Sequence, residues 1–247
     1  MTDGPQEAPT VVTSENDTRH SDSMRSAANW RASQWMAFGE FAIVALIFLA
    51  DHRHLIPLSK TPFLFLLGWI SLRLRRAGWR SVGFARYRNW AITIGIGIAA
   101  GVLTETFQLL ATQPLLVRLT GKQPDLDDFR MLTGNIKLAL VGFAFTWTLA
   151  AFGEEMVWRG YLMNRVADLG HQTRRAWICS LIAVSMVFGM AHANQGITGV
   201  VEEGIAGVFL GIIYLRTGRN LAVPIIAHGV QDTIDVVLIF LGKYPGM

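Results

Sequence analysis

Long apolar runs recur along the chain from Trp35 onward and alternate with short polar stretches. The runs cover residues 36–50, 61–72, 90–112, 134–152, 176–193, 200–215 and 221–241. Several approach the roughly 20 residues that a helix needs to cross a bilayer, although the first two need flanking residues. Because backbone groups in lipid must be hydrogen-bonded within their own segment, we expect helices rather than an open sheet. The pattern predicts an all-α, polytopic transmembrane bundle of about seven helices, with an eighth if the segment before Asp168 is separate.

Residues 1–34 differ in composition from everything that follows. They are rich in Ser, Thr, Asp and Asn, and they show neither an apolar period nor the apolar core of a signal peptide. This composition predicts a disordered cytoplasmic tail. We therefore divide the chain into that tail, N-terminal transmembrane helices at residues 35–133, and a C-terminal transmembrane domain at residues 134–241.

Composition and charge support a membrane protein. The chain is 51% hydrophobic and only 16% charged, whereas a soluble domain has about 25% charged residues. The single cysteine excludes an internal disulfide framework, and Cys179 lies in an apolar run, where we expect a small buried side chain. The small excess of Lys and Arg lies in loops, so it indicates membrane topology and not a nucleic-acid surface.

The sign of the loop charges predicts an orientation. Arginines gather in three loops (Arg73, Arg75, Arg76, Arg80, Arg86, Arg88; Arg165, Arg174, Arg175; Arg216, Arg219), and acids gather in another (Asp125, Asp127, Asp128). The arginine loops are expected on the cytoplasmic side. The N-terminus is then cytoplasmic, and we expect the protein in the plasma (inner) membrane, with the C-terminus outside if the number of crossings is odd.

Ionisable residues inside the last four apolar segments are few, and each costs at least about 2.5–3.5 kcal/mol at the bilayer centre. They include Glu154, Glu155, Arg159, His192, His228, Asp232 and Asp235. Glu155 and Arg159 are spaced i,i+4 and can pair on one helix face. Glu154 is turned by about 100° from Glu155, so it escapes that pair and is free to accept a proton from water.

Other spacings supply expectations about the same helices. Phe188 with His192, and His228 with Asp232, are also i,i+4 pairs. At 1.5 Å per residue, Glu154 and His192 would lie roughly 20–25 Å from the loop near Thr173, whereas His228 would lie about 12 Å from its own loop. A helix break at Pro224, or a Glu154 segment lying along the membrane surface, would resolve this mismatch.

Two further acidic positions and two glycine pairs are assigned structural roles. Glu202 and Glu203 form a second acidic pair, but Gly207 stands four residues after Glu203, so we expect both glutamates at the membrane interface. Glu105 is expected to be a packing or interfacial hydrogen-bonding residue. The spacings Gly97–Gly101 and Gly207–Gly211 favour close helix packing within one bundle over dimerisation.

Three motifs in order carry a resemblance to a known family. E-E-x-x-x-R (Glu154, Glu155, Arg159), F-x-x-x-H (Phe188, His192) and H-x-x-x-[ND] (His228, Asp232) lie on successive apolar segments. This set, with the "RGYL" that follows Arg159 and the "GIIYLRTGRNLAVPIIAHGV" leading to His228, resembles the CAAX-protease and bacteriocin-processing (CPBP or Abi) family of intramembrane proteases. The resemblance covers about residues 134–241, which would then be the catalytic domain.

The resemblance implies hydrolysis of a peptide bond inside the membrane. Eukaryotic members of the family remove the last three residues of prenylated CAAX proteins, and bacterial members are associated with peptide processing, bacteriocin self-immunity or regulation. Transferred to this chain, Glu154 would activate water with the help of His192, while His228 and Asp232 would stabilise the oxyanion. Glu155, Arg159 and Phe188 would support them. Many members have Asn where this chain has Asp232; an ionised Asp only accepts hydrogen bonds, so it would have to be protonated or orient His228.

The expected partners are the lipid bilayer and a peptide or protein substrate that enters from the membrane or the cytoplasmic side, with no nucleic acid. We favour a metal-free mechanism without a cofactor, because the H-E-x-x-H spacing of soluble zinc proteases is absent from the sequence. The alternative is a zinc site built from Glu154, His192 and His228. Two other functions stay open: a transporter or proton-relay protein, because buried acids and histidines also mark ion paths, and a non-catalytic member of the family.

Overall fold

The computed structural model describes residues 34–246, apart from residues 58, 86 and 88, and the predicted N-terminal tail at residues 1–34 lies almost wholly outside the described residues. The long elements are α2 (Gln34–His52), α3 (Thr61–Leu74), α4 (Trp90–Phe107), α5 (Gln113–Thr120), α6 (Ile136–Phe145), α7 (Met163–Leu169), α8 (Arg174–Met190), α9 (Gly196–Arg216) and α10 (Ala222–Phe240). Three π-helical segments, η3 (Gln108–Thr112), η5 (Thr146–Glu154) and η6 (Met156–Leu162), lie between them, and η2 (Trp79–Val82), η4 (Asp127–Leu132) and η7 (Ala193–Gln195) are short 3₁₀ turns. The described chain contains no strand, which confirms the predicted all-α class.

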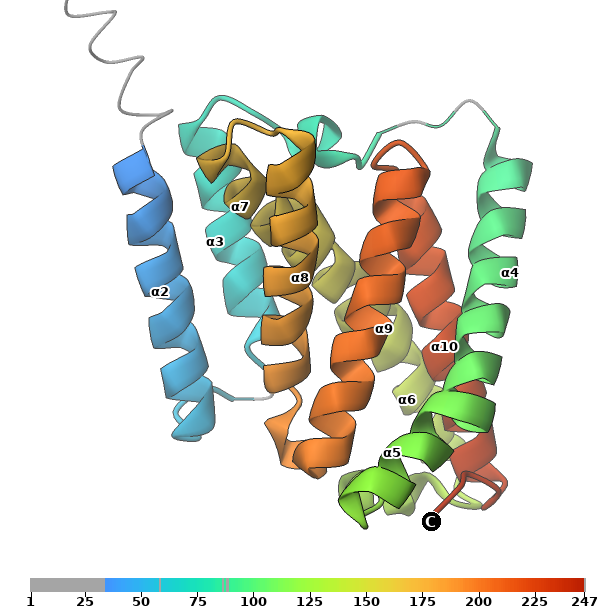
Figure 1. Cartoon of the computed structure of the whole chain (residues 1–247). Coiled ribbons are helices and arrows are strands. Elements are labelled where there is room, and N and C mark those ends of the chain that lie inside the picture. Colours follow the sequence, from blue (N-terminus) through green and yellow to red (C-terminus); the bar gives the residue numbers. More distant parts are fainter. Residues whose placement is uncertain (1–33, 58, 86, 88, 247) are drawn as a thin grey trace, which may run out of the picture.

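The helices run back and forth as a bundle (Figure 1). Two of the crossings are composite: residues 90–120 run through α4, η3 and α5, and residues 136–169 run through α6, η5, η6 and α7. Within the described part of the chain, five segments are long and apolar enough to cross a membrane: residues 34–52, 90–120, 136–169, 193–216 and 222–240. The predicted transmembrane bundle is therefore confirmed, and the segment that carries Glu154 belongs to a single long helix rather than to a separate eighth one.

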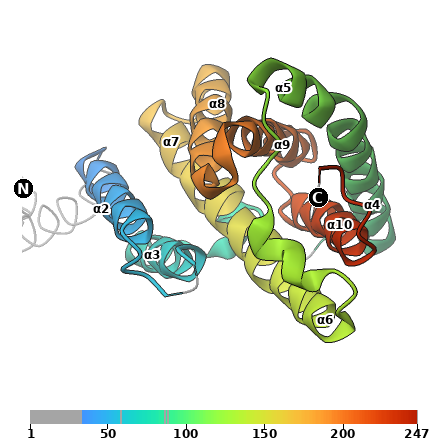
Figure 2. The same cartoon turned by 90° about the horizontal axis from the view of Figure 1, so that it is seen from below.

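This long helix is the centre of the bundle. Its 34 residues would extend about 51 Å at 1.5 Å per residue, well beyond the roughly 30 Å of a hydrocarbon core, so it must tilt. Figure 2 shows it crossing the bundle obliquely, with α2 and α3 on one side and α4, α5, α8, α9 and α10 on the other. Every residue from Glu155 to Arg165 is buried, so all faces of this stretch contact protein.

The tilt also corrects the depth argument made from the sequence. Because the helix is oblique, Glu155 reaches the level of His228 although it lies farther along its own helix from the connecting loop. No break at Pro224 is needed: α10 is continuous from Ala222, and Pro224 lies in its first turn, where the missing N–H has no intrahelical partner to lose.

The outside of the bundle is apolar. Large hydrophobic side chains are exposed on the outer faces of many helices, among them Leu46, Ile92, Leu103, Leu140 and Ile182. An exposed apolar surface that surrounds a bundle is suited to lipid and not to water. Together with the apolar helices, it identifies an integral membrane protein. Cys179 lies on this surface of α8 and is exposed, so the expectation that it is buried was wrong.

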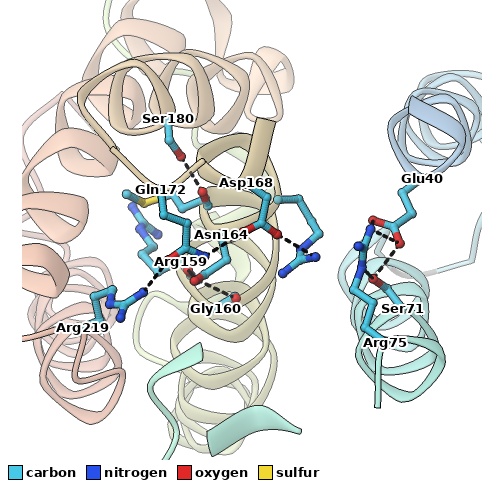
Figure 3. Close-up of polar contacts among 12 residues, drawn as sticks. Glu40, Ser71, Arg75, Arg159, Gly160, Asn164, Asp168, Gln172, Ser180 and Arg219 are labelled. Atoms are coloured by element: carbon cyan, nitrogen blue, oxygen red, sulfur yellow. Dashed lines mark hydrogen bonds and ion pairs between the residues drawn. The ribbon is translucent and has the colours of Figure 1, made fainter. Parts of the chain in front are cut away.

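A polar contact joins the first two helices. Glu40 of α2 is buried, and its carboxylate accepts hydrogen bonds from Ser71 Oγ (2.7 Å) and Arg75 Nη2 (3.1 and 3.2 Å), which belong to or follow α3 (Figure 3). A carboxylate within an apolar helix is costly unless it is paired and hydrogen-bonded. This pairing explains how α2 tolerates Glu40.

The glycine spacing on α4 produces close packing within the bundle, as predicted. The buried residues of α4 are Thr93, Gly97, Gly101 and Glu105, a single stripe at i,i+4 spacing that faces α10. A Cβ on Gly101 would lie 2.5 Å from the carbonyl oxygen of Ala227. Only glycine therefore permits α4 and α10 to approach this closely.

We predict that Gly101→Ala lowers the thermal stability of the detergent-solubilised protein, by about 1–3 kcal/mol, because the added methyl overpacks the helix contact. Gly95→Ala is the matched control in the same helix, since a Cβ there meets no atom within 4 Å. Equal melting temperatures for the two variants would contradict the packing argument.

Candidate active site

The carboxylate of Glu155 joins the central helix to α10. Glu155 is fully buried, and its Oε1 accepts a hydrogen bond from Arg159 Nη1 at 2.5 Å. The same oxygen lies 2.9 Å from His228 Nδ1 of α10. The predicted pair of Glu155 with Arg159 is thus present, and the contact with His228, which the sequence did not predict, connects two of the three motifs.

Arg159 extends the network to two more helices. It is 1% exposed, and its Nη2 donates a hydrogen bond to the carbonyl oxygen of Gly207 in α9 at 3.0 Å. Its guanidinium carbon lies 4.9 Å from the ring centroid of Phe188 in α8. Such a stacked arginine keeps its charge while it packs against an apolar surface. Gly207 leaves the necessary room, because a Cβ there would meet Phe188 and Ser185 at 3.2 Å.

Phe188 is the apolar centre of the site. It is 1% exposed, and its ring centroid lies 4.8 Å from the ring of His192, 6.3 Å from that of His228 and 5.3 Å from that of Trp158. The three motifs therefore meet around one aromatic ring. The supporting role expected for Phe188 stays a prediction.

His192 lies outside the helix in which we expected it. α8 ends at Met190, and His192 stands in the turn before η7, where it is half-buried. Its Nδ1 lies 2.9 Å from the carbonyl oxygen of Phe188. Because a carbonyl oxygen only accepts, this contact assigns the proton to Nδ1 and leaves Nε2 of the neutral ring as an acceptor. The apolar run continues past the helix end, which is why the sequence did not reveal the turn.

His228 is held between two acids. Its Nδ1 contacts Glu155, and its Nε2 lies 3.5 Å from Asp232 Oδ1, one turn further along α10. The second distance is longer than an ordinary N–H···O hydrogen bond, so this contact is the looser one. Arg159, Glu155, His228 and Asp232 form a chain of alternating basic and acidic groups, in which each buried charge has an opposite neighbour when His228 is protonated.

Glu154 differs from the adjacent Glu155 in both burial and hydrogen bonding. It is half-buried, and among the described residues its carboxylate makes no hydrogen bond and no ion pair. It nevertheless interacts electrostatically with Arg159, His228 and Asp232, and His192 interacts with Asp232 in the same way. Asp232 thus interacts electrostatically with the three other residues expected to be catalytic, and Glu154 is the unpaired carboxylate among the four.

The local helix geometry differs from the α-helix assumed from the sequence. Glu154 ends η5, and η6 begins directly after Glu155. In a π-helix each N–H bonds five residues back, which leaves carbonyls at the transitions without partners, and such turns are frequent at functional sites. Asn164 supplies the partner here: its Nδ2 lies 3.0 Å from the Arg159 carbonyl oxygen, 2.9 Å from that of Gly160 and 3.0 Å from the Tyr214 hydroxyl (Figure 3).

Several acids near the site were not assigned to it from the sequence. Glu202 is 6% exposed and lies in the second turn of α9, so it packs against protein, and the interfacial position expected for the pair with Glu203 stays a prediction. Glu105 is buried and interacts electrostatically with Asp235, and the hydrogen-bonding role expected for it also stays a prediction. The stripe Gly97, Gly101, Glu105 is the sequence signal that could have placed Glu105 opposite α10.

Three residues, Glu154, His192 and His228, were named as zinc ligands in the alternative mechanism. Within residues 34–246, as far as the structure describes them, no three His, Cys, Asp or Glu side chains are arranged to hold a metal ion. His228 has Nδ1 on Glu155, and His192 has Nδ1 on a backbone carbonyl, contacts that leave Nε2 of both rings available. The metal-free mechanism therefore stays a prediction.

Comparison with known proteins agrees with the motifs. Residues 136–234 match a family model described as type II CAAX prenyl endopeptidase Rce1-like. No curated protein and no solved structure matches the chain. The matched segment includes Glu154, His192, His228 and Asp232, so the family resemblance predicted from the three motifs is confirmed. This is a protease family, which supports a peptidase.

We predict that the two adjacent glutamates differ in their effect on stability. Glu155→Gln removes the charge that Arg159 and His228 share and leaves a buried arginine uncompensated, which costs about 3–5 kcal/mol. Glu154→Gln removes no hydrogen bond and should leave the melting temperature within about 2 °C of the wild type, a shift of at most about 1 kcal/mol for a chain of this size. Thermal unfolding in detergent, followed by intrinsic fluorescence, measures both; a larger loss for Glu154→Gln would overturn the assignment.

Proposed function

We propose that the protein is an intramembrane endopeptidase that hydrolyses a peptide bond with water activated by Glu154 and His192. The observation that carries the proposal is the contrast between the two glutamates. Glu155 is fixed by Arg159 and His228, whereas Glu154 is unpaired and interacts electrostatically with His228 and Asp232. A carboxylate without a partner is the one that can accept a proton.

The proposed reaction assigns each proton. Glu154 takes a proton from water while the water oxygen bonds to the carbonyl carbon of the scissile peptide, and Nε2 of His192 accepts a hydrogen bond that orients the water. Before the substrate binds, the Nε2–H of His228 points at Asp232, whose carboxylate orients the ring, a role open to an ionised acid. Because this contact is the looser of the two that His228 makes, the Nε2–H transfers its hydrogen bond from Asp232 to the oxyanion as the oxyanion forms. When the C–N bond breaks, Glu154 returns its proton to the leaving amine.

The substrate class follows from the matched family. A prenylated protein with a C-terminal CAAX sequence is the first candidate, because the matched model describes a CAAX prenyl endopeptidase. An unprenylated membrane peptide is the second candidate. Either substrate would enter from the membrane or from the cytoplasmic side, and the reaction as proposed uses no metal.

Activity can be measured with quenched fluorescent peptides, farnesylated and plain, and the protein in proteoliposomes. Glu154→Gln and His192→Ala should each lower kcat by at least about 100-fold, the usual range for loss of a general base, without a loss of melting temperature. Chelators should leave the rate unchanged. Turnover that survives either substitution would contradict the assigned roles, and inhibition by chelators would contradict the metal-free reaction.

A proton-relay function is the second candidate, and one observation favours it. Glu105, Asp235 and Glu202 are acids within α4, α10 and α9, and Glu105 interacts electrostatically with both of the others, so three apolar helices bring acids together. Proteoliposomes loaded with a pH-sensitive dye separate the two functions. Proton flux that persists in Glu154→Gln, without peptide hydrolysis by the wild type, would favour the relay.

The proposal includes an orientation. Arg80, Arg174 and Arg216 lie at the ends of helices that meet on one side of the bundle, and Asp127 and Asp128 lie on the opposite side (Figure 1). The arginine side faces the cytoplasm, together with the N-terminus, and the membrane is the plasma (inner) membrane.

In a Cys179→Ser background, single cysteines at exposed Asp128 and Gln172 test this orientation. A membrane-impermeant maleimide added to intact cells should label Asp128→Cys and spare Gln172→Cys. The reverse labelling pattern would show the opposite orientation.

A further inference from the structure

The loop between α2 and α3 reaches the turn that carries His192. Lys60 precedes α3, and its Nζ donates a hydrogen bond to the carbonyl oxygen of Ala191 at 3.1 Å, 131 positions away in sequence. The same ammonium lies 3.1 Å from Asp51 Oδ2 and 5.9 Å from the ring centroid of Phe48, both in α2. Its side chain is 17% exposed. The Lys60 ammonium is therefore held by Asp51 and Phe48 of α2, and it donates to the C-terminal end of α8.

Ala191 is the C-cap of α8, where backbone carbonyls have no partner within the helix. His192 provides hydrogen-bond partners for two of these carbonyls. Its backbone N–H donates to the carbonyl oxygen of Gly189, and its ring Nδ1 contacts the carbonyl oxygen of Phe188. Lys60 covers the carbonyl of Ala191 itself. A cation at this position also opposes the negative end of the helix dipole.

The contact acts directly on His192. The carbonyl carbon of Ala191 forms the peptide bond to the nitrogen of His192, so an anchor on that carbonyl fixes the plane from which the His192 side chain extends. The ring is already tied at Nδ1 to the same turn. Lys60 and Phe188 together thus hold the backbone and the imidazole of His192.

The residue after Lys60, Thr61, is the first residue of α3 and packs beside the backbone that precedes Glu154. Thr61 is 5% exposed, and its Cγ2 lies 3.0 Å from the place where a Cβ on Gly153 would be. Gly153 directly precedes Glu154. Two consecutive residues, Lys60 and Thr61, therefore contact the backbone on both sides of the site, beside Glu154 and beside His192.

We infer that Lys60 is a positioning residue, which sets the place of His192 relative to Glu154 through its hydrogen bond to the Ala191 carbonyl. The inference rests on the proposed endopeptidase function and extends it to a residue outside the segment that matches the family model. Asp51 holds the ammonium in place. The N-terminal helices then contribute to the site as well as to the membrane anchor.

The test compares Lys60→Met, Lys60→Arg and, as control, Lys137→Met, an exposed lysine at the start of α6. With the peptide substrates above, Lys60→Met should lower kcat about 10–100-fold with KM within about twofold, because small displacements of a catalytic group have effects of that size. Lys60→Arg, which can donate to the same carbonyl, should recover most of the rate. Lys137→Met should match the wild type.

A second measurement does not depend on activity. Hydrogen–deuterium exchange of residues 186–196 should be faster in Lys60→Met than in the wild type or in Lys137→Met, while exchange in α10 stays unchanged. If the wild type hydrolyses no peptide but this local exchange increases, the proposed function fails and the anchoring by Lys60 stands. Unchanged kcat in Lys60→Met, equal losses in Lys60→Arg and Lys60→Met, or exchange that rises throughout the bundle would overturn the inference.

Discussion

One buried oxygen atom, Oε1 of Glu155, is within hydrogen-bonding distance of both Arg159 Nη1 and His228 Nδ1, and the rest of the site depends on this shared contact. It ties the central helix to α10, and Arg159 carries the connection on to α9 and α8 through Gly207 and Phe188. Buried ion pairs seldom stabilise a protein relative to apolar packing, but removing one partner is costly. We therefore interpret the network mainly as a device that selects one arrangement of the four helices, and only secondarily as a source of stability.

This arrangement gives two identical side chains in adjacent positions different properties. Glu155 points into the network and is fully buried, whereas Glu154 is half-buried and has no hydrogen bond among the described residues. The π-helical segments on either side of Glu155 widen the helix at this point, and Asn164 satisfies the carbonyls that they free. The different environments of Glu154 and Glu155 thus depend on the π-helical geometry around them and on the side-chain amide of Asn164.

The sequence predicted what depends on local spacing and missed what depends on tertiary contacts. The apolar runs, the pair of Glu155 with Arg159 and the glycine stripe on α4 follow from helical periodicity, and the structure has all three. The contact of His228 with Glu155 spans 73 positions, so no periodicity reports it. His192 was placed inside a helix because apolar residues continue beyond Met190, where the helix ends. The burial of Glu202 depends on the packing of α9 against other helices, which no local pattern shows.

The most direct test of the shared contact is a double-mutant cycle on stability with Glu155→Gln and His228→Asn, measured by thermal unfolding in detergent. Residues in one buried network couple by about 0.5–3 kcal/mol, and we expect a coupling above about 1 kcal/mol, because either single variant already breaks the connection between the central helix and α10. Additive losses, with a coupling near zero, would show that the two side chains do not share a contact and would contradict the account.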